Sequence, residues 1–350
     1  MRTASPTPAL LDLEGMLEVI GKAPAIYRPA RFWADLNQVH LQQLSRDAFD
    51  HFKRTVNTRY FNWGILTHQW LGVTLRWLTR PVPEVFQAEF PSPRLPGGDH
   101  VGSFDPASAW LYKTFVAMYA EILSWEDPEG LLGRLQEPDL GNPFLIRYRG
   151  RGISQDLCNS IHEFYSMMAG ETPLVTPSRG LHFAELGAGY GRLAYAVLAA
   201  RPTASYCIID IPPALYVSQR YLTSLYPDIS VFLARQFDSY ESVREEFESA
   251  RLKFLLPHQL ELLPPKQFDY FINISTLHEM TSAQVENYFR QMGRLCRGRV
   301  YTKQWRVSRT RVNGCTLREG DYPVPRSWKT VFHRRHPIQR MFFEALYAVG

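Results

Sequence analysis

Two groups of residues in this 350-residue sequence have types and spacings that could do chemistry. The first is a glycine-rich run in which an acid precedes glycines at alternate positions, namely Glu185, Gly187, Gly189 and Gly191. Glycines allow a tight turn and let the backbone approach a ligand closely. The second is the dipeptide His278-Glu279, which joins a side chain that titrates near neutral pH to a carboxylate.

The elements predicted around the glycine run make it informative. It lies between a strand predicted at residues 181–186 and a helix predicted at 193–200. The next predicted strand, at 205–210, ends with Asp210, about 20 residues beyond the glycines, where a carboxylate can hold a ribose diol. These positions predict a site for a nucleoside-containing ligand.

The residues within the run help to choose that ligand. A dinucleotide fingerprint would have a small residue where this sequence has Arg192. The acid at Glu185 would repel a pyrophosphate, whereas it suits an ammonium group. The run looks like the S-adenosylmethionine (SAM) loop of class I methyltransferases, with Glu185 toward the ammonium of the methionine moiety. The alternatives are a glycine turn in an unrelated α/β protein and a degenerate nucleotide site.

Polar residues near the ends of later strands extend the predicted site, because ligands bind beyond the carboxyl ends of strands in open α/β sheets. His258 and Gln259 follow a strand predicted at 252–256, where an adenine amino group could bind, although a merely polar strand end is an equal alternative. Asn273 lies in the strand predicted at 268–274 and is grouped with the cofactor-binding residues, as a structural or substrate-orienting amide.

His278 and Glu279 are the predicted catalytic residues. Methyl transfer from a sulfonium is an in-line displacement, so an enzyme must align the acceptor and remove its proton. Either residue could be the base, and Glu279 could instead orient His278 or bind the acceptor. The alternative is that the pair only begins the helix predicted at 282–296, with Glu279 satisfying first-turn amides.

The order of predicted elements indicates the fold class. From residue 181 onward strands and helices alternate, which implies an α/β fold with a doubly wound, mainly parallel, Rossmann-like sheet. Helices are predicted at 9–21, 31–63 and 107–125, a Pro- and Gly-rich loop at 81–106, and a break at 138–152 before a helix with Ser154 as its N-cap. We therefore expect a helical N-terminal domain at 1–150, for acceptor recognition, a lid or dimer contacts, and a SAM-binding catalytic domain at 151–350.

Composition narrows the class of partner. The 39 basic and 34 acidic residues leave a net charge of +5 without a polybasic block, which favours a solvated surface over a nucleic-acid footprint. The four cysteines lack CxxC spacing, and His333 and His336 have no evident acid partner, so no metal site or disulfide framework is predicted. No apolar run approaches the roughly 18 residues of a membrane span, and the N-terminus is unlike a secretory signal. A cytoplasmic protein is expected.

The chain also resembles the sugar O-methyltransferase family of bacterial natural-product biosynthesis. The stretches that carry this resemblance are AELGAGYGRLAY (184–195), YCIIDIPPALYVSQRYL (206–222), FINISTLHEM (271–280), GDYPVPRSWKTVF (320–332), FKRTVNTRYFNW (52–63) and LGNP (140–143). The resemblance implies a class I SAM-dependent fold, sugar acceptors of antibiotics, and SAM contacts from Glu185, Gly187, Gly189, Gly191 and Asp210.

Three functions are weighed from these features. The first is SAM-dependent methylation of a sugar hydroxyl in secondary metabolism. The second keeps SAM but has a small nitrogen nucleophile as acceptor, such as an amino acid or its guanidine, with Glu279 binding a cation. The third, nucleic-acid methylation, is motivated only by a pI near 9.0, and the Asn/Asp-Pro-Pro-Tyr cluster is replaced here by Asn-Ile-Ser-Thr at 273–276. We expect a small-molecule acceptor, no nucleic-acid or membrane partner, and possible homodimers.

Overall fold

The computed structural model describes residues 10–29, 33, 37, 41, 44, 48–54, 106–170, 180–309 and 316–350. Most of the helix predicted at 31–63, the loop predicted at 81–106 and the aromatic residues between positions 60 and 77 lie outside the described residues.

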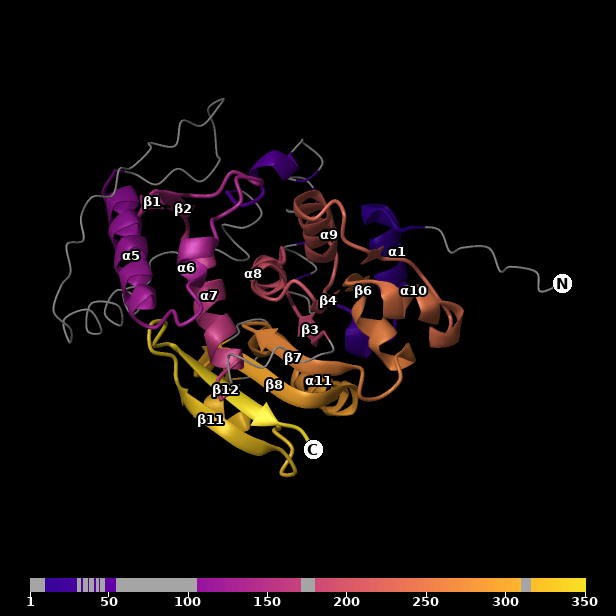
Figure 1. Ribbon diagram of the computed structural model, residues 1–350. Coiled ribbons are helices and arrows are strands. Elements are labelled where there is room, and N and C mark those ends of the chain that lie inside the picture. Colours follow the sequence, from indigo (N-terminus) through magenta and orange to yellow (C-terminus); the bar gives the residue numbers. More distant parts are fainter. Residues whose placement is uncertain are drawn as a thin grey trace.

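An eight-stranded sheet in the order β11-β12-β8-β7-β3-β4-β6-β5 lies at the centre of the fold (Figure 1). The strands from β5 to β8 in this order are parallel, whereas β12 is antiparallel to both β8 and β11. This arrangement confirms the predicted mainly parallel, doubly wound sheet. The strands are β3 (His182–Leu186), β4 (Ser205–Ile209), β5 (Val231–Phe232), β6 (Leu252–Leu255), β7 (Phe268–Ile274), β8 (Cys296–Trp305), β11 (Lys329–Arg335) and β12 (Phe342–Ala348).

Helices cover both faces of the sheet, which is why most residues of its central strands are buried and apolar. All five residues of β4 are buried, and the last four alternate between two hydrophobic clusters: Tyr206 and Ile208 face one layer, Cys207 and Ile209 the other. The first layer contains α5 (Pro106–Trp125), α7 (Gln155–Met167), α8 (Arg192–Ala200) and α9 (Ala214–Leu225). The second contains α10 (Arg244–Ser249) and α11 (Ser282–Leu295).

Shorter elements join these layers. They are α1 (Leu13–Lys22), α6 (Leu131–Arg134), the hairpins β1 (Ile146–Tyr148) with β2 (Arg151–Ile153) and β9 (Val307–Arg309) with β10 (Thr316–Arg318), and the 3-10 turns η1 (Ala25–Tyr27), η2 (Ala48–His51), η3 (Tyr240–Ser242), η4 (Pro257–Leu262), η5 (Leu277–Glu279) and η6 (Glu319–Asp321).

The break predicted at 138–152 thus contains a strand pair. Ser154 caps α7 as predicted, accepting a 3.0 Å hydrogen bond from the Leu157 amide. Helix α5 packs against α7, and the division into domains at residue 150 stays a prediction.

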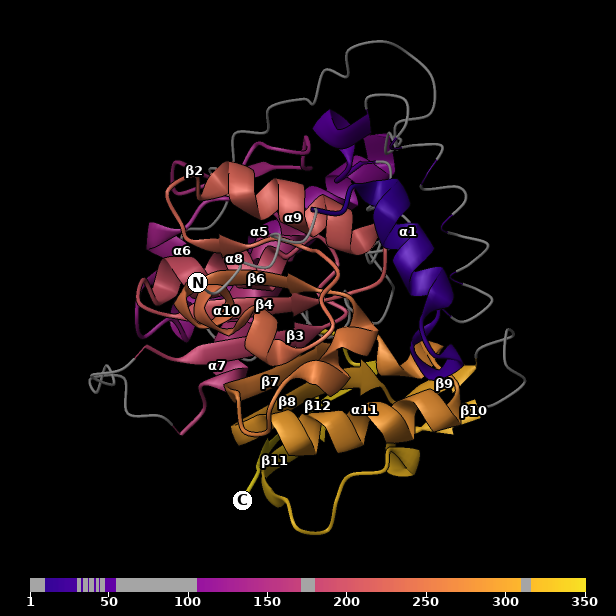
Figure 2. The same cartoon turned by 90° about the vertical axis from the view of Figure 1, so that its right-hand side faces the viewer.

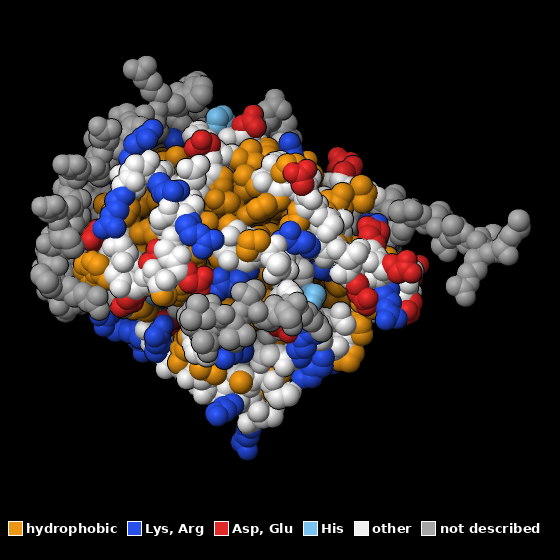
Figure 3. Space-filling model, in the orientation of Figure 1, with side chains coloured by type: hydrophobic (Ala, Val, Ile, Leu, Met, Phe, Trp, Pro, Cys, Tyr) orange, Lys and Arg blue, Asp and Glu red, His pale blue; other side chains and the backbone are white. Residues whose placement is uncertain are grey.

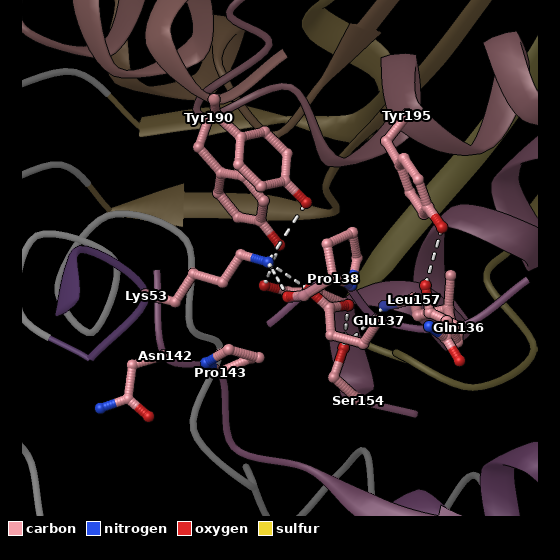
Figure 4. A network of polar contacts seen from close by, with 12 residues as sticks. Lys53, Gln136, Glu137, Pro138, Asn142, Pro143, Ser154, Leu157, Tyr190 and Tyr195 are labelled. Atoms are coloured by element: carbon pink, nitrogen blue, oxygen red, sulfur yellow. Dashed lines mark hydrogen bonds and ion pairs between the residues drawn. The ribbon is translucent and has the colours of Figure 1, made fainter. Parts of the chain in front are cut away.

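A buried ion pair joins Lys53 to Glu137, which lies between α6 and β1 (Figure 4). The Lys53 ammonium contacts Glu137, whose second carboxylate oxygen accepts a 2.6 Å hydrogen bond from Ser154 Oγ. Lys53 Nζ also donates to Tyr221 Oη at 3.2 Å and lies 5.3 Å from the ring centroid of Tyr190. Since Tyr190 belongs to the glycine run, this network supports the back of that run.

The surface is mixed in charge on the face shown in Figure 3, where Lys and Arg side chains are interspersed with acidic and apolar ones. Within the ranges the structure describes, no helix has both the length and the apolar character that crossing a membrane would require.

Candidate active site

A cleft opens at the carboxyl edge of the sheet, where β3, β4 and β7 end. In the sheet, β3 lies between β4 and β7. Open α/β sheets bind ligands beyond the carboxyl ends of the strands at the position where the chain connections turn to opposite sides. The strand ends and the turns after them contribute Glu185, Leu186, Gly187, Ala188, Gly189, Asp210, Ile211, Pro257, Ile274, Ser275, Thr276 and Glu279. These strand-end residues are up to 94 positions apart in the chain, from Glu185 to Glu279.

Residues near the N-terminus form a further wall of the cleft, which the sequence patterns did not indicate. Tyr27, Arg28 and Trp33 are among the lining residues. The turn that carries Tyr27 and Arg28 is held by α11, because Gln284 Nε2 donates a 2.9 Å hydrogen bond to the Arg28 carbonyl and Tyr27 packs edge-on against Tyr288. Figure 2 shows α1, which precedes this turn, descending toward α11 and the β9–β10 hairpin.

The glycine run makes the turn between β3 and α8. Gly187 has φ +73°, and a Cβ there would lie 2.1 Å from Thr276 Oγ1, so any side chain would collide with the turn after β7. Between the last two glycines, Tyr190 points away from the cleft. Its Oη donates a 2.8 Å hydrogen bond to Asp156, and its ring packs on Phe52. The turn is thus held from behind while its backbone faces the cleft.

Asp210 is attached to the same turn. One of its carboxylate oxygens accepts from the Gly189 amide at 2.8 Å, and the other accepts from the Ile211 amide at 2.8 Å. The side chain is buried and lines the cleft, and burial raises the pKa of Asp210 to about 7. The predicted ribose-binding acid and glycine turn therefore lie together.

Glu185 lies at the floor of the cleft. It is buried, accepts a 2.7 Å hydrogen bond from Tyr206 Oη, and has a pKa raised to about 7 by burial. Arg192, which opposes this rise, is held by Glu163 through two hydrogen bonds of 2.5 and 3.0 Å. Lys303 Nζ donates to the same Glu163 at 2.8 Å. Glu185 is thus a desolvated acid. A cationic ligand beside it would stabilise its ionised form.

Ser275 is a strained residue in the lining of the cleft. Its φ is +56°, a conformation that costs a residue with a side chain of order 1–3 kcal/mol. Its Oγ is buried with no hydrogen-bond partner among the described residues. A buried hydroxyl of this kind in a cleft is suited to a polar group of a ligand. No pattern in the sequence indicates this residue.

The two predicted catalytic residues differ in their position. Glu279 lines the cleft, whereas His278 is 5% exposed and lies behind it. His278 Nε2 is 3.4 Å from Glu279 Oε1, and the imidazole packs on Trp305 with ring centroids 5.7 Å apart. The structure brings the pair together and gives Glu279 the direct access to a ligand.

Four predicted cofactor-binding residues do not line the cleft. At one of them, Gly191, a Cβ would lie 2.7 Å from Leu222 Cδ1 of α9, so this glycine allows close packing of the turn instead. Gln259 is occupied by backbone groups, accepting from Leu256 N at 2.9 Å and donating to Arg235 O at 2.8 Å. His258 lines a separate hollow beside α1. The reason is that the chain enters η4 at Pro257, and this turn directs the next side chains elsewhere. Asn273 lies under the cleft, fully buried.

The histidines near the C-terminus have acid neighbours that sequence analysis did not identify. His333 Nε2 lies 3.1 Å from Glu319, and His336 lies near Glu344 and His162, with potential ligand atoms within 4.8 Å of one another. His336 Nδ1 accepts hydrogen bonds from two backbone amides, so its Nε2 carries the proton and has no lone pair for a cation. This group therefore does not have the donor set of a metal site.

Comparison with known proteins gives similarities in fold. The sequence matches no protein-family model, and a search of curated proteins finds no match. The resemblance to the sugar O-methyltransferase family therefore stays a prediction.

Among solved structures, a SAM-dependent methyltransferase from Leishmania major is similar, with 17% identity, a TM-score of 0.37 and coverage of 54% of this chain and 70% of that one. A SAM-dependent methyltransferase from Aquifex aeolicus has 10% identity, a TM-score of 0.31 and coverage of 55% and 98%. A protein from Pyrococcus horikoshii OT3 has 12% identity, a TM-score of 0.36 and coverage of 54% and 91%.

The chain has the class I, Rossmann-like α/β fold. Its own strand order and parallel pairing carry this assignment.

Proposed function

We propose that this chain is a SAM-dependent methyltransferase that methylates a small-molecule acceptor. The observation that carries the proposal is the joining of Glu185, the glycine turn and Asp210 in one cleft, with Gly189 bonded to Asp210. A function on this fold has to be argued from its site, because similar folds serve many reactions.

The residues of the cleft fit SAM. Glu185, buried and with a raised pKa, would hold the ammonium of the methionine moiety, and Asp210 would hold the ribose diol. Ser275 supplies a buried hydroxyl that lacks a partner among the described residues. When bound, SAM would supply a methyl group attached to a positively charged sulfur. A nucleophile bonds to the methyl carbon, the carbon–sulfur bond breaks, and S-adenosylhomocysteine is released.

The chain's own part in the reaction is alignment and proton removal. Aligning two reactants can account for about 7–11 kcal/mol of the barrier, and a general base contributes a further 10²–10⁴-fold. Glu279 lines the cleft and is 3.4 Å from His278 Nε2, so a proton taken from the acceptor can pass from the carboxylate to the imidazole. These two residues are therefore proposed to act as a pair.

A sugar hydroxyl in secondary metabolism is the proposed acceptor. The resemblance of the sequence to sugar O-methyltransferases supports this acceptor. The presence of Glu279 and His278 also supports it, because a hydroxyl must lose its proton to a general base during methyl transfer. One observation favours a second candidate, a small nitrogen nucleophile: the residue that faces the cleft is the carboxylate of Glu279, which can bind a cation, and His278 lies behind it.

Calorimetric titration with SAM, S-adenosylhomocysteine and NAD tests the proposal. Micromolar binding of the first two with no binding of NAD is expected, and a preference for NAD, or no binding at all, would overturn the proposal. Acceptors are then screened by a mass gain of one methylene. A hydroxyl acceptor should lose most turnover in both Glu279→Gln and His278→Asn, whereas a nitrogen acceptor should suffer mainly in Glu279→Gln.

A further inference from the structure

Arg192 places a partly buried cation in the lining of the cleft. It is the first residue of α8, and its side chain is 16% exposed. Glu163 of α7 holds one edge of the guanidinium, because its two oxygens accept from Nη1 at 2.5 Å and from Nη2 at 3.0 Å. Nη1 also donates to Ser160 Oγ at 3.0 Å. These three contacts fix the orientation of the guanidinium from the side of α7.

A second edge of the guanidinium has no partner among the described residues. A guanidinium carries five N–H groups in one plane. Three of those of Arg192 donate to Glu163 and Ser160, which leaves the Nε–H and one N–H of Nη2. These two groups lie side by side on the edge that Glu163 does not occupy. Such an edge fits a second carboxylate, because two parallel N–H groups match its two oxygens.

Lys303 keeps that edge attractive to an anion. Its Nζ donates to Glu163 at 2.8 Å, so one carboxylate is shared by two cations. Although burial raises the pKa of Glu163, Arg192 and Lys303 lower it to about 2. Glu344, opposite Lys303 in the sheet, is paired with Arg334 at 2.8 Å. The group of Glu163, Arg192 and Lys303 therefore has more positive than negative charge, and Arg192 is the member that reaches the cleft.

Glu185 lies near Arg192 in the same cleft. The two residues are on either side of the glycine turn, and Arg192 opposes the rise in the pKa of Glu185 that burial causes. The cleft thus offers a carboxylate and an open guanidinium edge close to each other. This combination is complementary to an α-amino acid group, which carries an ammonium and a carboxylate on one carbon.

We propose that Arg192 binds the carboxylate of the methionine moiety of SAM, beside the ammonium held by Glu185. The assignment rests on the proposed function and deepens it, because it gives the second charged group of that moiety a partner. Glu163 holds the guanidinium from behind, so the open edge is directed before the ligand arrives. A carboxylate on the acceptor would fit the same edge, and the experiment below distinguishes the two sources.

Calorimetric titration with SAM and decarboxylated SAM tests the assignment. The decarboxylated analogue keeps the sulfonium and the ammonium and lacks the carboxylate. The wild-type protein should bind it about 10–100-fold more weakly than SAM, because two hydrogen bonds between charged groups are lost. Equal affinities would overturn the inference, and this comparison does not depend on the folding of any variant.

Arg192→Lys then tests the residue itself. Lysine keeps a cation beside Glu163 but has no flat edge with two parallel N–H groups. This variant should bind SAM about 10–100-fold more weakly than the wild type and bind the decarboxylated analogue nearly as the wild type does. A folded Arg192→Lys protein with the wild-type preference for SAM over the analogue would overturn the inference.

Arg201→Lys is the matched control. Arg201 caps the other end of α8 and also contacts an acid at two points, with hydrogen bonds of 2.6 Å to each oxygen of Glu129, but it does not line the cleft. Its substitution by lysine should leave both affinities unchanged.

The outcomes separate this inference from the proposed function. Tight binding of SAM without discrimination against the decarboxylated analogue would refute the role of Arg192 alone. If the open edge instead binds a carboxylate of the acceptor, SAM and the analogue should bind alike, and Arg192→Lys should raise the KM of carboxylate-bearing acceptors only. A wild-type protein that does not bind SAM would refute the proposed function, and the assignment of Arg192 with it.

Discussion

The backbone amide of Gly189 donates a hydrogen bond of 2.8 Å to the carboxylate of Asp210, 21 positions further along the chain. The bond ties the turn after β3 to the end of β4, in the middle of the cleft. The second oxygen of Asp210 is held by the Ile211 amide, so the side chain has one preferred orientation. Because loop and acid depend on each other, a change in either should affect the same ligand.

Removal of the Asp210 carboxylate should weaken SAM binding. In Asp210→Ala the Gly189 amide loses its acceptor and the ribose loses its charged partner, which together should raise the Kd by about 10–100-fold. Calorimetric titration measures the change. Asp228→Ala, at an exposed position away from the cleft, is the control and should bind normally. An unchanged Kd in folded Asp210→Ala would show that this acid does not contact SAM.

Binding of SAM should release protons near neutral pH. Burial raises the pKa of both Glu185 and Asp210 to about 7, so both are partly protonated there in the free protein. An ammonium beside Glu185 lowers that pKa, and the affinity should therefore rise between about pH 6 and pH 8. Calorimetry in buffers of different ionisation enthalpy counts the protons. Glu185→Gln should release fewer, and net proton uptake by the wild type would contradict the assignment.

Ser275 allows strain and hydrogen bonding to be separated. Ser275→Ala removes the hydroxyl but keeps the strain of a side chain at positive φ, whereas Ser275→Gly removes both the hydroxyl and that strain. The glycine variant should therefore be more stable than the alanine variant by roughly 1 kcal/mol. Both should bind SAM more weakly than the wild type if the hydroxyl contacts it. Urea unfolding and calorimetry supply the two measurements. Equal stability of the two variants would argue against strain at this position.

The Lys53–Glu137 pair should be important for stability. Lys53→Met leaves a buried carboxylate without its cation, which should lower the free energy of unfolding by about 3–5 kcal/mol. Lys22→Met breaks an exposed pair with Glu18 and should have no measurable effect. Chemical unfolding compares the two variants. A small loss in Lys53→Met would mean that water or another cation compensates Glu137.

Sequence patterns were sufficient for features that depend on near neighbours. The alternation of strands and helices, the N-cap at Ser154, the glycine turn and the acid that follows β4 were all predicted, because periodicity and capping are local properties. Gly187 was also predictable as a turn residue, although the collision that requires glycine there involves Thr276, far along the chain.

Tertiary structure decided which polar side chains reach the cleft. The direction of a residue after a strand depends on the turn that it enters, and η4 directs His258 and Gln259 away where the sequence predicted adenine contacts. The wall that includes Tyr27 has no local pattern at all. It arises only when segments distant in the chain pack together, because only then do burial and hydrogen bonding select an orientation for each side chain.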